Sequence, residues 1–290
     1  MNYRHGFHAG NHADVLKHVL LLDLLRQLQR KPNPLFVLDT HAGRGAYRLN
    51  DAAAQTTREF DSGIGALRRL ATTERARAPA ELLHYLESVA RFSSGDETIY
   101  PGSPNLLAQA LRPGDRLAAC ELQPDEAAAL RDNLAHCAAA SVHQRSGYEA
   151  LPALVPPAER RGLVLIDPPY EQQRDEFELI ERALQKSLQR WPQGVYALWY
   201  PIKQGSTLTP IMRRLAALPA KTILDTRLLI RADDSPLRLN GSGMLICNPP
   251  WQFAERIAPV LDWLAEHLVA AGAAETGASA SCRWLKEEPT

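Results

Sequence analysis

Four consecutive residues, Asp167-Pro168-Pro169-Tyr170, directly follow a short apolar run at 162–166. The Asp167 carboxylate and the Pro168 carbonyl are hydrogen-bond acceptors, and the two prolines stiffen the loop that carries them. Such acceptors can hold the N–H bonds of an exocyclic amine, whose lone pair is delocalised into its ring, and draw the nitrogen toward sp³ geometry. Tyr170 offers a flat face for a base, and stacking is worth roughly 1–3 kcal/mol, comparable with the cost of extruding that base. The pattern predicts chemistry on a base amino group, with Asp167, Pro168 and Tyr170 as catalytic residues.

The same four residues resemble the catalytic motif of amino-methyltransferases that act on adenine, cytosine or guanine. The structural alternative is a turn in which the two prolines merely stop a strand. A second run, Asn248-Pro249-Pro250-Trp251, resembles the Asn version of the motif. Asp167 lies on the fourth strand counted from a glycine-rich turn, whereas Asn248 follows a late strand, which we expect near the far edge of the sheet. We therefore assign the second run to structure.

Short apolar runs alternate with helical stretches along most of the chain. The runs lie at 35–39, 116–122, 162–167, 195–200, 221–230 and 243–248, and the helical stretches at 125–137, 175–190, 207–218 and 253–268. This alternation predicts an α/β fold, a largely parallel sheet with helices on both faces. Asn11 is expected to cap an earlier helix, and 278–285 either adds a last strand or frays.

One stretch, from about residue 46 to residue 100, interrupts the alternation. It contains no convincing strand, but 60–71 and 79–92 carry helical spacing. We predict a Rossmann-like class I methyltransferase domain from 1–45 and 101–290, with an inserted helical subdomain at 46–100. The arginines of the insertion are nearly matched by acids, which favours a solvated face over an RNA-binding patch.

The strand at 35–39 ends in an Asp-x-x-x-Gly-x-Gly turn, from Asp39 to Gly45. Ligands of doubly wound sheets bind at this edge, and glycine lets the backbone approach them closely. Glu121 closes the next strand, where a carboxylate can accept both hydroxyls of a ribose. Asp39, Gly43 and Glu121 are thus predicted cofactor-binding residues, although a plain tight turn is an alternative for the glycines.

Two further loops reach the same edge. The third strand, near 142–144, ends at Ser146-Gly147, where methyltransferases usually contact the adenine of the cofactor; a polar loop without that role is the alternative. Residues 100–104, Tyr-Pro-Gly-Ser-Pro, form a rigid turn that opens a helix. Ser103 in this turn is expected to cap the helix, to touch the cofactor, or to do both.

The segment 3–18 contains four histidines, and His41 adds a fifth at the glycine turn. Their spacing matches no familiar zinc pattern and no cysteine lies nearby, so we predict no metal. This segment, with 38–45, 100–104 and 165–170, resembles the bacterial 23S ribosomal RNA adenine-N6 methyltransferase J family. The resemblance extends over essentially the whole chain.

The resemblance implies that S-adenosylmethionine is the cofactor and that N6 of one adenine in 23S ribosomal RNA is the target. It implies an RNA contact for Tyr3, and Lys17 could place a positive charge near the substrate or the cofactor carboxylate, unless it is a solvated helix lysine. Ser146 departs from the acid expected there in the family, which leaves the adenine contact to the backbone or to Gly147. The cofactor contacts that the resemblance implies are His18, His41, Ser103, Glu121, Ser146, Gly147 and Asp167.

Composition sets wider limits on the function. The formal net charge is +0, which argues against a protein that coats nucleic acid through a global positive field. No signal peptide or membrane span is evident, and four scattered cysteines suggest reduced thiols. We expect a cytoplasmic monomer.

Three other functions remain as alternatives to an adenine-N6 methyltransferase of 23S ribosomal RNA. They are an amino-methyltransferase for guanine N2 of ribosomal RNA or adenine of DNA, a non-catalytic RNA-binding assembly factor, and a metal-dependent hydrolase.

Overall fold

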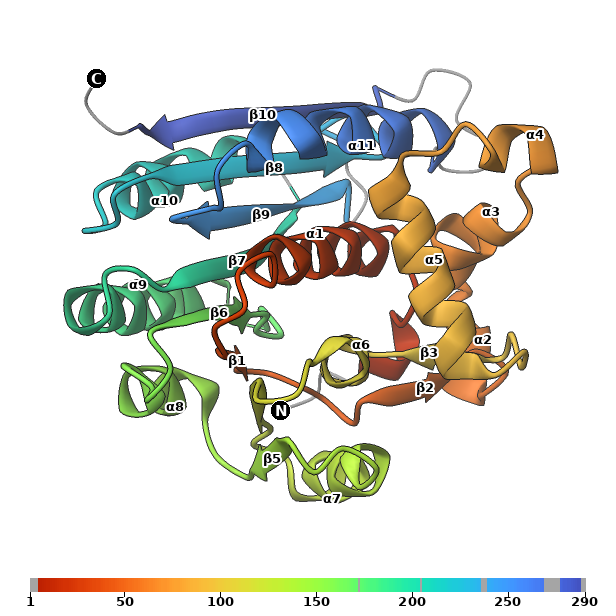
Figure 1. The fold of residues 1–290 in the computed structure, drawn as a ribbon. Helices are drawn as coiled ribbons and strands as arrows, with labels where there is room; N and C mark the ends of the chain where they lie inside the picture. Colours follow the sequence, from red (N-terminus) through yellow and green to blue (C-terminus); the bar gives the residue numbers. More distant parts are fainter. Residues whose placement is uncertain (1–4, 172, 204, 236–238, 269–276, 288–290) are drawn as a thin grey trace.

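The structure, a computed structural model, describes residues 5–171, 173–203, 205–235, 239–268 and 277–287. Its main sheet has eight strands in the order β10-β8-β9-β7-β6-β1-β4-β5 (Figure 1). The strands are β1 (Leu35–Asp39), β4 (Arg116–Cys120), β5 (Ala140–His143), β6 (Arg161–Ile166), β7 (Val195–Ile202), β8 (Ile223–Leu229), β9 (Gly241–Cys247) and β10 (Ser279–Lys286).

The strands from β5 to β7 pair in parallel, whereas β9, β8 and β10 pair antiparallel to their neighbours. Two short strands, β2 (Ala46–Arg48) and β3 (Ile99–Pro101), form a separate antiparallel pair. The predicted α/β fold with a largely parallel sheet is confirmed. The predicted last strand is also present, as β10.

Helices cover both faces of the sheet. Side chains alternate along β1, so that Val37 packs into one apolar cluster and Leu38 into another on the opposite face. The first cluster includes residues of α1 (His12–Leu28), α6 (Ser103–Ala110), α7 (Pro124–Leu134) and α11 (Phe253–His267). The second includes residues of α8 (Gly147–Leu154), α9 (Gln173–Arg190) and α10 (Gly205–Ala216). Among the helices of the described ranges, none is both long and apolar enough to span a bilayer.

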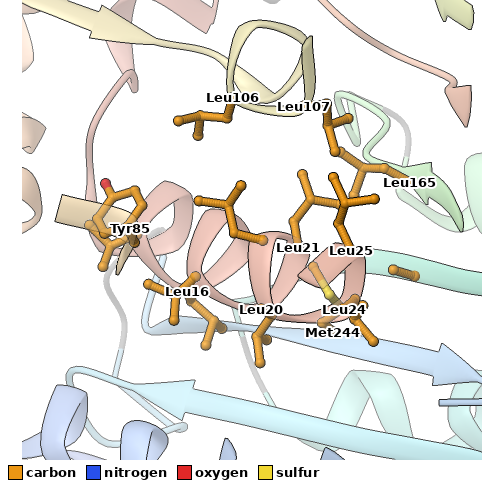
Figure 2. Close-up of a cluster of buried hydrophobic side chains, with 14 of the residues drawn as sticks. Leu16, Leu20, Leu21, Leu24, Leu25, Tyr85, Leu106, Leu107, Leu165 and Met244 are labelled. Atoms are coloured by element: carbon orange, nitrogen blue, oxygen red, sulfur yellow. The ribbon is translucent and has the colours of Figure 1, made fainter. Parts of the chain in front are cut away.

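Helix α1 lies inside the molecule rather than on its surface. The Asn11 side chain caps it by accepting hydrogen bonds from the N–H groups of Ala13 and Asp14, as predicted. Every residue of the helix except Arg26 is buried. Figure 2 shows its leucines directed to opposite sides, toward Leu106 and Leu107 of α6 and toward Met244 of β9. A helix enclosed on all sides holds its polar residues in fixed positions.

The segment 46–100 contains more than helices. The sequence predicted no strand here, yet β2 and β3 lie at its two ends, too short to give a recognisable alternation. Between them lie α2 (Ala52–Thr57), α3 (Ile64–Arg68), α4 (Thr72–Arg75) and α5 (Ala80–Ser93). The helix predicted at 60–71 is broken at Gly63, which has a non-helical backbone and packs so closely on Gly10 that a Cβ would lie 2.1 Å from the Gly10 carbonyl oxygen. Tyr85 of α5 packs in the same apolar cluster as α1, so the segment 46–100 shares a core with the rest of the chain. Its assignment as a separate subdomain stays a prediction.

The run at 248–251 has a structural role, but not for the reason expected. Strand β9 lies between β7 and β8 rather than at the far edge. Because β9 runs antiparallel, Cys247 pairs with Tyr196 near the start of β7, and Asn248 emerges at the edge opposite Asp167. The Asn248 side chain accepts from the Lys221 N–H and donates to the Pro192 carbonyl. Asn248 therefore links the loop that contains Lys221 to the loop that contains Pro192.

Candidate active site

A pocket opens where β1, β4 and β6 end, at the carboxyl edge of the parallel strands. It encloses about 970 Å³, including its open mouth. Nine of the residues predicted from the sequence line it: Lys17, His18, His41, Gly43, Ser103, Glu121, Ser146, Gly147 and Asp167. Segments far apart in the chain thus converge on one cavity.

The glycine turn and Glu121 form one side of this pocket. Gly43 has φ +59°, and a Cβ there would lie 2.4 Å from the Tyr47 hydroxyl, so a larger residue would be strained and would displace the Tyr47 side chain. The Glu121 carboxylate accepts hydrogen bonds from the N–H groups of Gly43 (3.0 Å) and Gln123 (2.7 Å). Burial raises the pKa of Glu121, against these backbone hydrogen bonds. Each carboxylate oxygen retains a lone pair with which it can accept a ligand hydroxyl.

Asp39 differs from its predicted role, because it lies beneath the pocket rather than on its wall. Its side chain is fully buried, and the Ser103 hydroxyl donates to it across 2.6 Å. Burial raises the pKa of Asp39 to about 7. Ser103 begins α6 without capping it and also lines the pocket. Asp39 therefore positions Ser103 instead of reaching a ligand itself.

The raised pKa of Asp39 predicts a pH dependence of stability. A folded-state pKa above that of the unfolded chain means that the folded state binds the extra proton, so this contribution to stability falls as pH rises from about 4 to about 7. Asp39→Asn keeps an acceptor for Ser103 without the charge. Denaturant titrations across this range should show the variant gaining stability relative to the wild type as pH rises. A constant difference would contradict a buried, titrating Asp39.

Two neutral histidines line the pocket. Burial lowers the pKa of both His18 and His41 to about 3. His18 Nδ1 lies 2.9 Å from the Tyr100 hydroxyl, while its buried Nε2 has no partner among the described residues. The Thr40 hydroxyl donates to the Leu165 carbonyl, so it accepts from His41 Nδ1 at 2.8 Å. His41 Nε2 is then an acceptor.

A chain of buried charges joins the start of α1 to the catalytic loop. Lys17 Nζ lies 2.7 Å from an Asp14 oxygen and 2.6 Å from an Asp167 oxygen, and its side chain is 5% exposed. It is therefore not a solvated helix lysine. His5 Nε2 lies 3.0 Å from the other Asp14 oxygen, which also accepts from the Gly10 N–H.

The charges in this chain stabilise one another. Burial alone would raise the pKa of Asp14, but the His5 ring and the Lys17 ammonium hold it well below its usual value. Burial alone would lower the pKa of Lys17, yet Asp14 and Asp167 raise it above its usual value. Sequence reasoning missed both Asp14 and His5. The spacing of Asp14 three residues before Lys17 on an apolar helix was the available signal.

Two members of the catalytic motif lie away from the pocket wall. Pro168 is buried and does not line the cavity, whereas Pro169, which was not singled out, does. Tyr170 is 3% exposed; its ring packs against Phe177 and Trp199, and its hydroxyl donates to the Trp199 carbonyl. In this structure Tyr170 thus presents no free face on which a base could stack, contrary to the sequence prediction. Tyr3 lies outside the described residues.

Gly147 allows two loops of the pocket to meet. It begins α8, and a Cβ on it would lie 2.1 Å from the Thr40 carbonyl oxygen, a backbone atom that cannot easily move. The adjacent Ser146 makes no capping hydrogen bond. Close packing of the loops after β1 and β5 therefore requires glycine here.

Gly147→Ala is expected to weaken ligand binding in this pocket by at least about tenfold, because the two loops must separate to relieve the clash. Isothermal titration with S-adenosylmethionine measures the change. Gly6→Ala is the matched control, since its Cβ would lie 3.9 Å from the Ala53 side chain. Equal affinities for the two variants would show that the loop contact does not shape the site.

Comparison with known proteins identifies the family. A family model described as RsmJ, ribosomal RNA large subunit methyltransferase D, RlmJ, matches residues 32–285. The chain belongs to this family. It is 36% identical over 290 residues to ribosomal RNA large subunit methyltransferase J of Haemophilus influenzae, covering 99% of this chain and 100% of that protein. It is 37% identical over 289 residues to the Escherichia coli protein of the same name, with the same coverage.

A solved structure supports the RlmJ fold assignment. The crystal structure of protein LPL1258 from Legionella pneumophila superposes with a TM-score of 0.82 at 32% sequence identity. The match covers 96% of this chain and 97% of that one. Fold and family thus agree over nearly the whole length of both chains.

The pocket of this RlmJ-family chain fits S-adenosylmethionine, the methyl donor that a methyltransferase requires. The Glu121 carboxylate oxygens are placed where they could accept ribose hydroxyls, and glycines at 43 and 147 let the surrounding loops pack closely around the pocket. The unpartnered Nε2 of His18 is a buried polar atom that a ligand could contact. Within the described ranges no three His, Cys, Asp or Glu side chains are grouped so that they could hold a metal ion.

Proposed function

We propose that the protein transfers a methyl group from S-adenosylmethionine to N6 of a specific adenine in 23S ribosomal RNA. The observation that carries the proposal is the Asp167 carboxylate, which lines the cofactor pocket and is held by Lys17 across 2.6 Å. The sequence relatives, named for methylation of the large-subunit ribosomal RNA, support the choice of RNA.

Each group of the pocket has a definite task in this proposal. When bound, S-adenosylmethionine supplies a methyl group activated by the positive charge on its sulfur. Glu121 holds the ribose, and His18 and His41 bind polar atoms of the cofactor or the base. Asp167 accepts an N–H of the adenine amine, which makes the nitrogen lone pair available for in-line attack. The protein mainly supplies positioning and electrostatics.

Lys17 acts on Asp167 rather than on the amine. An ammonium that donates to one carboxylate oxygen fixes the orientation of the carboxylate. The other carboxylate oxygen is left to accept the substrate N–H. Lys17 is therefore a positioning residue, and Asp14 positions Lys17 in turn.

The deciding experiment incubates the protein with methyl-labelled S-adenosylmethionine and unmodified ribosomal RNA, followed by digestion to nucleosides. Label on N6-methyladenosine is expected. Label on guanosine would select the guanine N2 alternative. A parallel reaction with DNA tests the other alternative, since label on DNA but not on RNA would select a DNA methyltransferase. RNA binding without any transfer would favour the assembly factor.

We also propose that the protein acts as a monomer in the cytoplasm. The Cys120 and Cys247 thiols are buried and unpaired, which fits a reducing compartment. Light scattering coupled to size-exclusion chromatography tests the oligomeric state. A dimer at micromolar concentration would contradict the monomer.

A further inference from the structure

A second cavity lies apart from the methyltransferase pocket, between α10 and the strands β8 and β10. It encloses about 1040 Å³, including its open mouth. Three arginines line it, Arg213 from α10, Arg227 from β8 and Arg283 from β10, while Asp233 is the single acid on its described wall. A protein of zero formal net charge concentrates positive charge at this place.

A buried carboxylate organises two of these arginines. Asp225 is fully buried, and one of its oxygens accepts from Arg227 Nε at 2.9 Å and from Arg283 Nε at 3.2 Å. The Tyr200 hydroxyl donates to the other oxygen. Asp225 pairs directly with Arg283 in the sheet register, so the two arginines project from adjacent strands on one face.

The positive charge exceeds what the structure needs. One arginine would neutralise Asp225, yet two are bound to it, and the Arg283 side chain is 53% exposed. The third, Arg213, makes no hydrogen bond or ion pair with any residue that the structure describes. Guanidinium groups held by Nε keep their outer N–H groups in a planar fork, a geometry that suits phosphate oxygens.

The cavity lies within reach of the reacting centre. β8 is the third strand from β6 and β10 the fourth, so at about 4.8 Å per strand their axes lie roughly 14 and 19 Å from the axis of β6, the strand that leads into Asp167. In the register Arg227 pairs with Gly243 and Gly243 with Tyr200, which directly follows Trp199, the residue that binds the Tyr170 hydroxyl.

We infer that this cavity binds a backbone phosphate of the RNA whose adenine is methylated. The inference rests on the proposed function and deepens it. A phosphate contact fixes register and orientation without reading sequence, and each such contact contributes to the salt dependence of binding. The cavity thus orients the RNA while the target base is bound in the methyltransferase pocket.

The test compares three single variants that each remove one positive charge. Arg213→Gln and Arg283→Gln alter the cavity, and Arg182→Gln on α9 is the matched control, since Arg182 is exposed and paired only with Glu178. Affinity for an unmodified 23S ribosomal RNA transcript is measured by filter binding at several salt concentrations. Methylation kinetics with the same transcript give kcat and KM, and thermal melting confirms folding.

Each cavity variant is expected to bind the transcript about three- to tenfold more weakly, with the slope of log affinity against log salt reduced by about 0.7–0.9. KM for RNA should rise and kcat at saturating RNA should stay unchanged. Arg213→Gln decides the matter if Arg283→Gln fails to fold, because Arg213 supports no described contact. Cavity variants that match Arg182→Gln in affinity and slope would overturn the inference, while absence of wild-type methylation would instead overturn the proposed function.

Discussion

Asp167→Asn is expected to lower kcat for methyl transfer by at least about a hundredfold, the scale of the loss when one preorganised hydrogen-bond partner of the reacting group is removed. Asparagine keeps the size of the side chain and one acceptor oxygen but loses the negative charge that holds the amine N–H and pairs with Lys17. The nitrogen lone pair then stays delocalised in the ring. Single-turnover transfer from labelled S-adenosylmethionine to ribosomal RNA measures the loss.

The control for this variant is Asp175→Asn, which removes an exposed carboxylate a few residues further along the chain. It should transfer methyl groups at the wild-type rate. Affinity of Asp167→Asn for the cofactor, measured by calorimetry, should change much less than kcat, because Glu121 and the glycine turn remain intact. Full activity in Asp167→Asn would remove the residue from the reaction and leave the catalytic assignment without support.

Lys17→Met is expected to destabilise the protein by roughly 3–5 kcal/mol, the cost of leaving a buried charge without its partner. Methionine fills the volume of the lysine stem, so the loss arises from Asp14 and Asp167, which lose the cation between them. The pKa of Asp14 should rise in the variant, because the His5 ring is then the remaining cation that lowers it against burial. In the wild type the lowered pKa of Asp14 makes acid destabilising, so the loss of stability on acidification should be smaller in the variant. Urea unfolding at two pH values measures both slopes.

Lys17→Met/Asp14→Asn separates stability from activity. Removing both charges of a buried pair is often nearly neutral, and asparagine still accepts from the Gly10 N–H. The double variant should therefore recover most of the lost stability. It should not recover kcat, because Asp167 still lacks the ammonium that orients it. Recovery of activity together with stability would show that Lys17 serves the fold alone.

The sheet and the pocket were predictable because they depend on local patterns. Apolar runs ending in Asp39, Glu121 and Asp167 indicated parallel strands, and parallel strands of a doubly wound sheet bring their carboxyl ends to one edge. Helical periodicity likewise predicted α9, α10 and α11 to within a few residues. Once these strands were predicted, the edge of the sheet at which Asp167 lies was predicted as well.

The remaining features depend on contacts that no local pattern reveals. The direction of β9 is decided by pairing with β7 and β8, so the sequence could not show that Asn248 leaves at the opposite edge. Burial of Tyr170 depends on its packing with Phe177 and Trp199. The position of Asp39 beneath the pocket involves a hydrogen bond from Ser103, which lies 64 residues later in the chain, so no local pattern could reveal it.

The enclosed position of α1 has a consequence for synthesis on the ribosome. Its residues emerge long before β9 and α11, which cover one side of it and begin only at Gly241 and Phe253. At about 5–20 residues per second, roughly 10–50 s pass before those partners are available. During that interval a leucine-rich helix carrying Lys17 and His18 is exposed on one side. The apolar side of α1 that β9 and α11 later cover therefore stays open to water or to other apolar surfaces until most of the chain has been made.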